Sequence, residues 1–265
     1  MKSLKSLALA ALLSFAAAGA WASDAADEFI RAIKQDSGSG MTALLRQGVD
    51  PNTRDPRGVP GLYLALQEGS LDAAKAILAA PRLNPNALTP TDESPLMMAA
   101  LKGQVDIARA LIAKGGAVNK SGWTPLHYAA TGGNTDMIRL LLDHRATVEA
   151  LSPNETTPLM MAARYGSVEA VQMLLRAGAD PRRRNGLGMD ALDFAVSGER
   201  PDAIELLTQA KRRAPVRPVV PAPESAPAGT AVQVLPQDSS AMPPPGMAIQ
   251  VTPRAGPASA PRGTW

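Results

Sequence analysis

The amino-acid sequence predicts an all-α solenoid of about six stacked helix pairs, each followed by a short loop that projects as a finger. Two repeated patterns lead to this prediction. The first is a motif of Ser or Thr, Pro and Leu that ends in Ala-Ala. The second is a pair of aliphatic residues that falls 13 to 16 residues after the leucine of each motif. Because both patterns recur in phase, one supersecondary unit repeats along the chain.

The motif is strongest at residues 94–100, 124–130 and 157–163, with weaker copies at 60–65 and 190–195. Its leucine position defines the register of the units. The spacings between successive positions are 33, 34, 30, 33 and 33 residues. The residues at this position are Phe29, Leu62, Leu96, Leu126, Leu159 and Leu192.

Each unit contains the signals of two helices. The Ser or Thr is a helix N-cap, and Pro suits the first helical position because it has no N–H to leave unpaired. The Ala pair lets the first helix approach its neighbours closely. Glycines such as Gly103, Gly133 and Gly166 separate the two helices, and the aliphatic pair belongs to the buried face of the second. One unit cannot bury this face alone, so the units must stack.

These motifs resemble the ankyrin repeat, with its T-P-L-H-x-A signature at about 33 residues. The resemblance covers residues 24–210 in six units. It implies that His127 forms hydrogen bonds near the start of its helix and supports the next loop. The first unit, with Ser37–Gly40, and the last, with Asp193, depart from the motif as terminal caps would. Three residues are missing between Asn119 and Trp123, which predicts a short finger there.

Composition weakens most enzyme hypotheses. The chain has no Cys, which excludes disulfides, thiol catalysis and zinc–cysteine sites. Its two His residues leave almost no material for a histidine-based metal site or a catalytic triad. The methionine pairs at 97–98 and 160–161 could suggest copper. Adjacent helical residues point about 100° apart, however, and the register places them in the core. We therefore expect no catalytic residue, no metal and no cofactor.

The first 22 residues have the pattern of a signal peptide. Lys2 and Lys5 precede an apolar run that is too short to span a bilayer, and Ala20-Trp21-Ala22 fits a cleavage site. We expect export to a bacterial periplasm with no membrane insertion after cleavage, or secretion as the alternative. The formal charge of +3 lies at the two ends, because residues 23–210 hold 19 basic and 22 acidic residues. That balance argues against a nucleic-acid partner.

The composition changes near the C-terminus. Residues 214–265 contain 12 of the 24 Pro residues and show no apolar periodicity. Such a segment buries too little apolar surface to fold, so we expect disorder with polyproline II character. The predicted organisation is a signal peptide at 1–22, a repeat domain at 23–211 and a disordered Pro/Ala-rich tail at 212–265.

The sequence favours non-catalytic protein binding by a monomer. In the geometry of the resembled family, loop tips and the ends of the first helices stay unburied on one concave face. These positions give the candidate contacts, which are Arg57, Glu68, Glu93, Lys102, Trp123, Asn154, Arg164, Tyr165, Arg184 and Met189.

The partner is another protein of unknown identity. By resemblance to exported bacterial proteins, a role in envelope stress or oxidant defence is one expectation. Two alternatives stay open. The repeats could be a spacer or scaffold whose Pro-rich tail makes the contact, or the protein could be a secreted effector that binds a host protein.

Overall fold

A computed structural model describes residues 24–213, and six helix pairs occupy that range. The predicted all-α solenoid is confirmed there. The predicted signal peptide and nearly all of the predicted tail lie outside the described residues. The pairs are residues 24–34 with α2 (Gly38–Arg46), α3 (Gly61–Glu68) with α4 (Leu71–Ala79), α5 (Pro95–Leu101) with α6 (Val105–Ala113), α7 (Pro125–Gly132) with α8 (Thr135–Asp143), α9 (Pro158–Tyr165) with α10 (Val168–Arg176), and α11 (Ala191–Ser197) with α12 (Pro201–Arg213).

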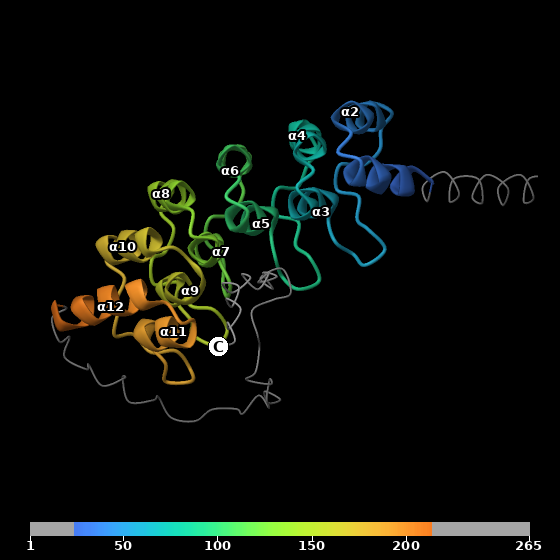
Figure 1. Cartoon of the computed structure of the whole chain (residues 1–265). Coiled ribbons are helices and arrows are strands. Elements are labelled where there is room, and N and C mark those ends of the chain that lie inside the picture. The colour runs from blue at the N-terminus through green and yellow to red at the C-terminus, as the bar shows by residue number, and fades with distance from the viewer. Residues whose placement is uncertain (1–23, 214–265) are drawn as a thin grey trace, which may run out of the picture.

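The helices form two layers in a curved stack (Figure 1). The first helices of the pairs (α3, α5, α7, α9 and α11) make the inner, concave layer, and the second helices make the outer layer. Among helices α2 to α12, the larger contacts join only elements of the same or the adjacent repeat. The fold is therefore a row of nearest-neighbour interfaces with one continuous apolar core.

The predicted caps start the inner helices. The hydroxyl oxygens of Ser94 and Thr157 accept hydrogen bonds from the N–H groups of Met97 and Met160, at 3.2 and 3.3 Å. A second hydrogen bond runs from the cap residue back to the methionine, and it is less expected. The thioether sulfurs of Met97 and Met160 accept the cap N–H at 3.2 and 3.4 Å. These fully buried methionines fill the core and also satisfy a backbone donor.

Glycine permits the close approach of successive inner helices. A Cβ atom on Gly132 would lie 2.5 Å from the carbonyl oxygen of Leu101. A Cβ atom on Gly166 would lie 2.3 Å from the carbonyl oxygen of Ala130. A side chain at either position would therefore push neighbouring repeats apart.

A ladder of asparagines joins the loops that follow the outer helices. The side chain of Asn52 donates to the carbonyl of Arg82 and accepts the N–H of Asn84, at 2.9 and 2.7 Å. Asn86 makes the same two bonds one repeat on, to Gly115 and Ala117. Asn119 makes them in the following repeat, to Arg145 and Thr147. Each amide satisfies backbone groups of the next loop, so the spacing of the repeats is set by hydrogen bonds as well as by packing.

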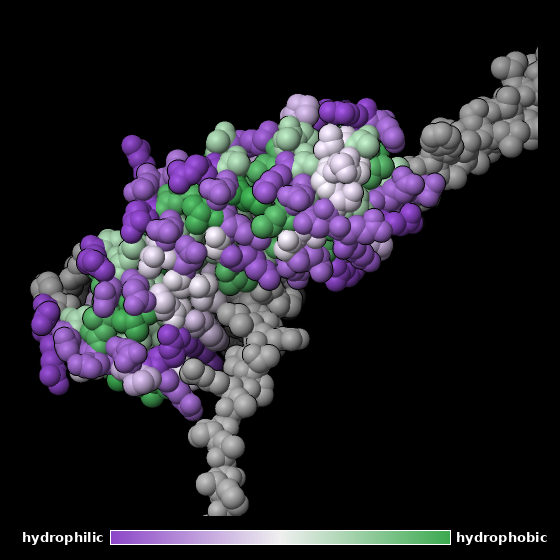
Figure 2. All heavy atoms as spheres, turned by 45° about the horizontal axis from the view of Figure 1, so that its top comes forward, coloured by the Kyte–Doolittle hydropathy of each residue, from purple (hydrophilic) through white to green (hydrophobic). Residues whose placement is uncertain are grey.

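The surface on the outer-helix side is largely hydrophilic, with apolar patches between polar side chains (Figure 2). A groove of about 330 Å³ lies between α10 and α12, and Leu175 and Leu206 are among the residues that line it. No helix within residues 24–213 has both the length and the apolar character that a membrane span requires.

Arg145 holds a left-handed backbone conformation at a position that other repeats give to glycine. Gly48, Gly115 and Gly178 follow their outer helices by two residues with φ of 96°, 87° and 95°. Arg145 follows α8 in the same way with φ of 62°. We expect Arg145→Gly to raise the free energy of unfolding by about 1 kcal/mol, because glycine removes the Cβ penalty. Urea unfolding measures this.

Gly115→Ala is the matched control. No atom lies within 4 Å of a Cβ placed there, so only the backbone is strained. It should lower the free energy of unfolding by about 1 kcal/mol. Equal effects of opposite sign support the backbone argument, and a destabilising Arg145→Gly would refute it.

Candidate protein-binding surface

Four of the fingers share one turn built around a short polar side chain. The side chain accepts a backbone N–H from the residue four positions on, and the main chain closes between the same two residues at 2.9 to 3.1 Å. The third residue after it has positive φ in every case. Turns of this kind are preorganised because their polar groups are satisfied internally. The polar residues are Asp55, Thr89, Ser152 and Asn185.

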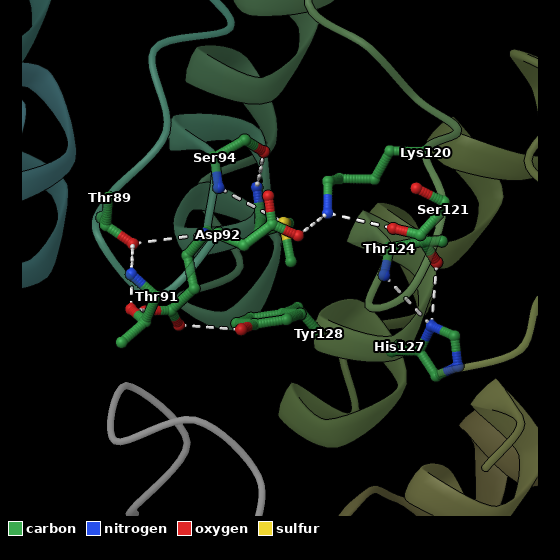
Figure 3. Close-up of polar contacts among 11 residues, drawn as sticks. Thr89, Thr91, Asp92, Ser94, Lys120, Ser121, Thr124, His127 and Tyr128 are labelled. Atoms are coloured by element: carbon green, nitrogen blue, oxygen red, sulfur yellow. Dashed lines mark hydrogen bonds and ion pairs between the residues drawn. The ribbon is translucent and has the colours of Figure 1, made fainter. Parts of the chain in front are cut away.

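The finger between α6 and α7 lacks this turn, as its three missing residues predict. No closing bond joins residues 117–123 within the described chain. Lys120 extends instead to the preceding finger, where its ammonium group donates to Asp92 and to the carbonyl of Ser121, at 2.5 and 3.0 Å (Figure 3). The finger between α6 and α7 is therefore shorter than its neighbours, and the ion pair between Lys120 and Asp92 connects it to the preceding finger.

The candidate residues at the fingertips are held in place. Arg57 pairs with Asp55 at 2.8 Å. Burial acts to raise the pKa of Asp55, but hydrogen bonds from the Val59 N–H and from Arg57 outweigh it, and the net shift is downward. The guanidinium of Arg184 donates to the carbonyl of Gly188 at 2.7 Å, and Asn154 bonds Ser152 at 2.5 Å. Arg57 and Arg184 are exposed and Asn154 is half-buried.

The ends of the inner helices carry a second set of candidates. Glu68 ends α3 and Lys102 caps α5, and both are exposed. At the end of α9 the guanidinium of Arg164 lies 5.2 Å from the ring centroid of Tyr165 and donates to the Ser197 hydroxyl at 3.2 Å. Tyr165 is 37% exposed. These two side chains form a fixed cationic and aromatic pair on the inner side of the stack.

Trp123 and His127 are in contact, and His127 links two repeats. Trp123 is half-buried and meets the His127 ring edge to face, with centroids 5.2 Å apart. The Nδ1 atom of His127 accepts the N–H of Thr124 at 3.2 Å (Figure 3). Its Nε2 atom donates to the carbonyl of Thr156 at 2.9 Å. The Thr156 carbonyl can only accept, so Nε2 carries the proton. The role that the resemblance implied for His127 is therefore seen here.

Glu93 corrects the prediction that it is an unburied contact residue. It is only 3% exposed. Its carboxylate accepts hydrogen bonds from the hydroxyls of Tyr128 and Thr91, at 2.7 and 2.9 Å. Burial, together with the charge of Glu93 and a hydrogen bond to it, raises the pKa of Tyr63 and that of Tyr128. Glu93 therefore joins the finger to the inner helices on both sides, α3 and α7.

Met189, like Trp123, is half-buried and packs against the core. The remaining candidates spread along successive repeats and do not converge on one cavity. No group of three or more His, Asp or Glu side chains able to hold a metal ion occurs among residues 24–213. An extended row of fixed polar and aromatic side chains is suited to binding another macromolecule.

The buried hydrogen bonds of Glu93 predict a structural effect. We expect Glu93→Gln to lower the free energy of unfolding by about 2 kcal/mol, because the neutral amide leaves a buried hydroxyl poorly paired. Denaturant unfolding measures it. Glu68→Gln, at an exposed site, should change it by less than about 0.5 kcal/mol. Equal values for the two variants would show that Glu93 has no such role.

The buried His127 makes stability depend on pH. Burial lowers the pKa of His127 from 6.5 to about 4, although hydrogen bonds to backbone groups oppose the shift. Between these values the unfolded chain binds a proton that the folded chain does not. The stability that depends on neutral His127 should therefore be fully present above pH 6.5. The free energy of unfolding should fall by up to about 3 kcal/mol as the pH drops from 6.5 to 4.

Urea unfolding at pH 7.5, 5 and 4 tests this dependence. His127→Met is the matched variant, because methionine occupies the same motif position at Met97 and Met160. It should lose the part of the pH dependence that His127 causes. If both proteins lose stability in parallel as the pH falls, the titration of His127 is not responsible.

Comparison with known proteins identifies the family. Residues 29–119, 62–152, 114–185 and 147–216 match a family model described as ankyrin repeats (3 copies). Neurogenic locus notch homolog protein 1 of Mus musculus is 32% identical over 176 residues, which are 66% of this chain and 6% of that protein. The palmitoyltransferase Hip14 of Drosophila melanogaster is 43% identical over 70 residues, which are 26% of this chain and 11% of that protein. The chain thus spans only a small part of the length of these curated relatives. It belongs to the ankyrin-repeat family, whose repeats are protein–protein interaction modules.

Proposed function

We propose that this protein is a non-catalytic module of the bacterial envelope that binds a partner protein on the concave side of its repeats. The fixed pair of Arg164 and Tyr165 carries the proposal. Arginine and tyrosine are among the residues that most often dominate interface energies. Here the guanidinium is already positioned by the Tyr165 ring and the Ser197 hydroxyl. Little side-chain freedom would be lost when a partner binds.

The fingers support the same surface. Arg57 and Arg184 stand on tips whose backbone is closed by internal hydrogen bonds. Glu68 and Lys102 add exposed charges of opposite sign at the ends of the inner helices α3 and α5. Charges at such positions select partners and set the association rate more than they add affinity. A partner with acidic and aromatic groups would complement the Arg164 end of the surface.

The envelope location is supported by the sequence of residues 1–22. Two lysines, an apolar run and a small-residue site in that order are the features of a cleavable export signal. The absence of cysteine suits an oxidising compartment. A role in stress or oxidant defence is part of the same proposal and depends on the partner.

A photocrosslinking amino acid at position 165 tests the proposal in cells. The comparator carries it at Val251 in the Pro-rich segment. We expect one protein to be captured from position 165 and not from position 251, with mass spectrometry identifying it. Capture from position 251 alone would favour the tail as the contact and the repeats as a spacer.

Purified partner then allows a quantitative test. Arg164→Ala should weaken binding about tenfold or more, while the thermal midpoint stays close to the wild-type value. Arg109→Ala is the matched control, because Arg109 is exposed on the outer helix α6. Equal binding by both variants would remove the concave pair from the interface.

A further inference from the structure

The C-terminal end of the stack exposes apolar side chains that every earlier repeat buries. Val196 is the sixth residue of its motif helix and is 56% exposed. The residues at the same position in the four preceding inner helices α3, α5, α7 and α9 are all 0% exposed, because the next repeat covers them. They are Leu66, Ala100, Ala130 and Ala163.

Two further positions repeat the pattern. Leu192 is half-buried, whereas its counterparts Leu62, Leu96, Leu126 and Leu159 are buried. On the outer helix, Ile204 is half-buried, whereas Ala74, Ala108, Ile138 and Val171 at the same position are buried. The end face therefore consists of Leu192, Val196 and Ile204. Polar substitution, the usual way to finish a solenoid, occurs at Asp193 and at Thr208, which takes the position of Leu78, Ile112, Leu142 and Leu175, but the three end-face residues stay apolar.

The chain leaves the structure beside this end face. The ammonium group of Lys211 in α12 donates to Asp190, the N-cap of α11, at 2.6 Å, and the carbonyl of Lys211 accepts from Arg182 at 2.5 Å. The last turn of α12 thus lies near the start of α11. In the preceding repeat, the residues after α10 lead into the next finger from the equivalent point.

We propose that residues 214–221 lie along α11 and cover Leu192, Val196 and Ile204. Val196 is six residues beyond Asp190, or about 9 Å along the helix. In polyproline II conformation the chain from residue 214 to Val219 spans about 16 Å, enough to cross to α11 and reach Val196.

The composition of residues 214–221 fits this place. Val216, Val219 and Val220 supply apolar side chains, and the prolines at 215, 218 and 221 reduce the entropy lost on docking. The segment also carries Arg217 and no acidic residue, and Asp193 and Glu205 are exposed on the two helices it would meet. Its charge is complementary to these two.

A second copy stacked head to tail would fit this face less well. The groove between the two helices of the first pair has an apolar part at Ala32, Ala43 and Leu44, but Glu28, Arg31, Gln35 and Gln47 also line it. A stacked copy would have to desolvate these polar side chains. The inference does not involve the proposed partner surface, so either can fail while the other holds.

Disulfide trapping in the full chain tests the inference, because the protein has no cysteine of its own. Val196→Cys is combined with Val219→Cys, and in the control with Val251→Cys. The shorter loop alone accounts for about a fourfold faster closure in the first pair. Docking should give an intramolecular disulfide more than about twentyfold faster, seen by intact mass. A difference near fourfold would overturn the proposal, as would a disulfide that joins two chains.

A charge placed in the segment supplies the second measurement. Val219→Asp should lower the thermal midpoint by about 2 to 4 °C, because it disrupts the cover of the last repeat. Val251→Asp, in the same Pro-rich sequence, should leave it unchanged. Equal midpoints for both variants would also overturn the proposal.

Discussion

The structure depends on one constraint, which is that no helix pair of this chain can bury its own apolar face. Apart from residues 24–34 and α12, which are longer, each inner helix has seven or eight residues and each outer helix has nine. Isolated helices of that length are marginal in water. The stack solves this by covering the inner positions of one repeat with the next. The 30- to 34-residue period, the alanine pairs and the glycines between the helices all serve that contact.

Hydrogen bonds between repeats add direction to the apolar packing. The Asn52, Asn86 and Asn119 amides, the His127 ring and the Glu93 carboxylate each reach the neighbouring repeat. Apolar surfaces alone allow sliding, whereas a buried polar group must meet its partner or lose the bond. These contacts therefore fix the register of one repeat on the next. A surface built from several repeats then keeps its geometry.

The sequence was sufficient for the architecture, because its two periodic patterns report the local rules of caps and buried pairs directly. The six units, the short finger before Trp123 and the packing of the methionine pairs could all be predicted. The asparagine ladder was missed, although its spacings of 34 and 33 residues match the repeat. The thioether caps were missed because methionine is rarely considered as an acceptor. The burial of Glu93 was missed because the repeat register assigns exposure only from a residue's position within its unit. It does not reveal that Tyr63 on α3 and Tyr128 on α7, the inner helices on the two sides of α5, both direct their hydroxyls at the carboxylate.

Contacts that join only adjacent repeats have a consequence for how such a chain can change. Tandem duplication of one unit inserts a new interface that copies the existing ones and leaves the others intact. Loss of an internal unit likewise closes the stack onto a neighbour of the same shape. The number of fingers offered to a partner can therefore vary by steps of about 33 residues. The two terminal units are not exchangeable in this way, because each must end the row.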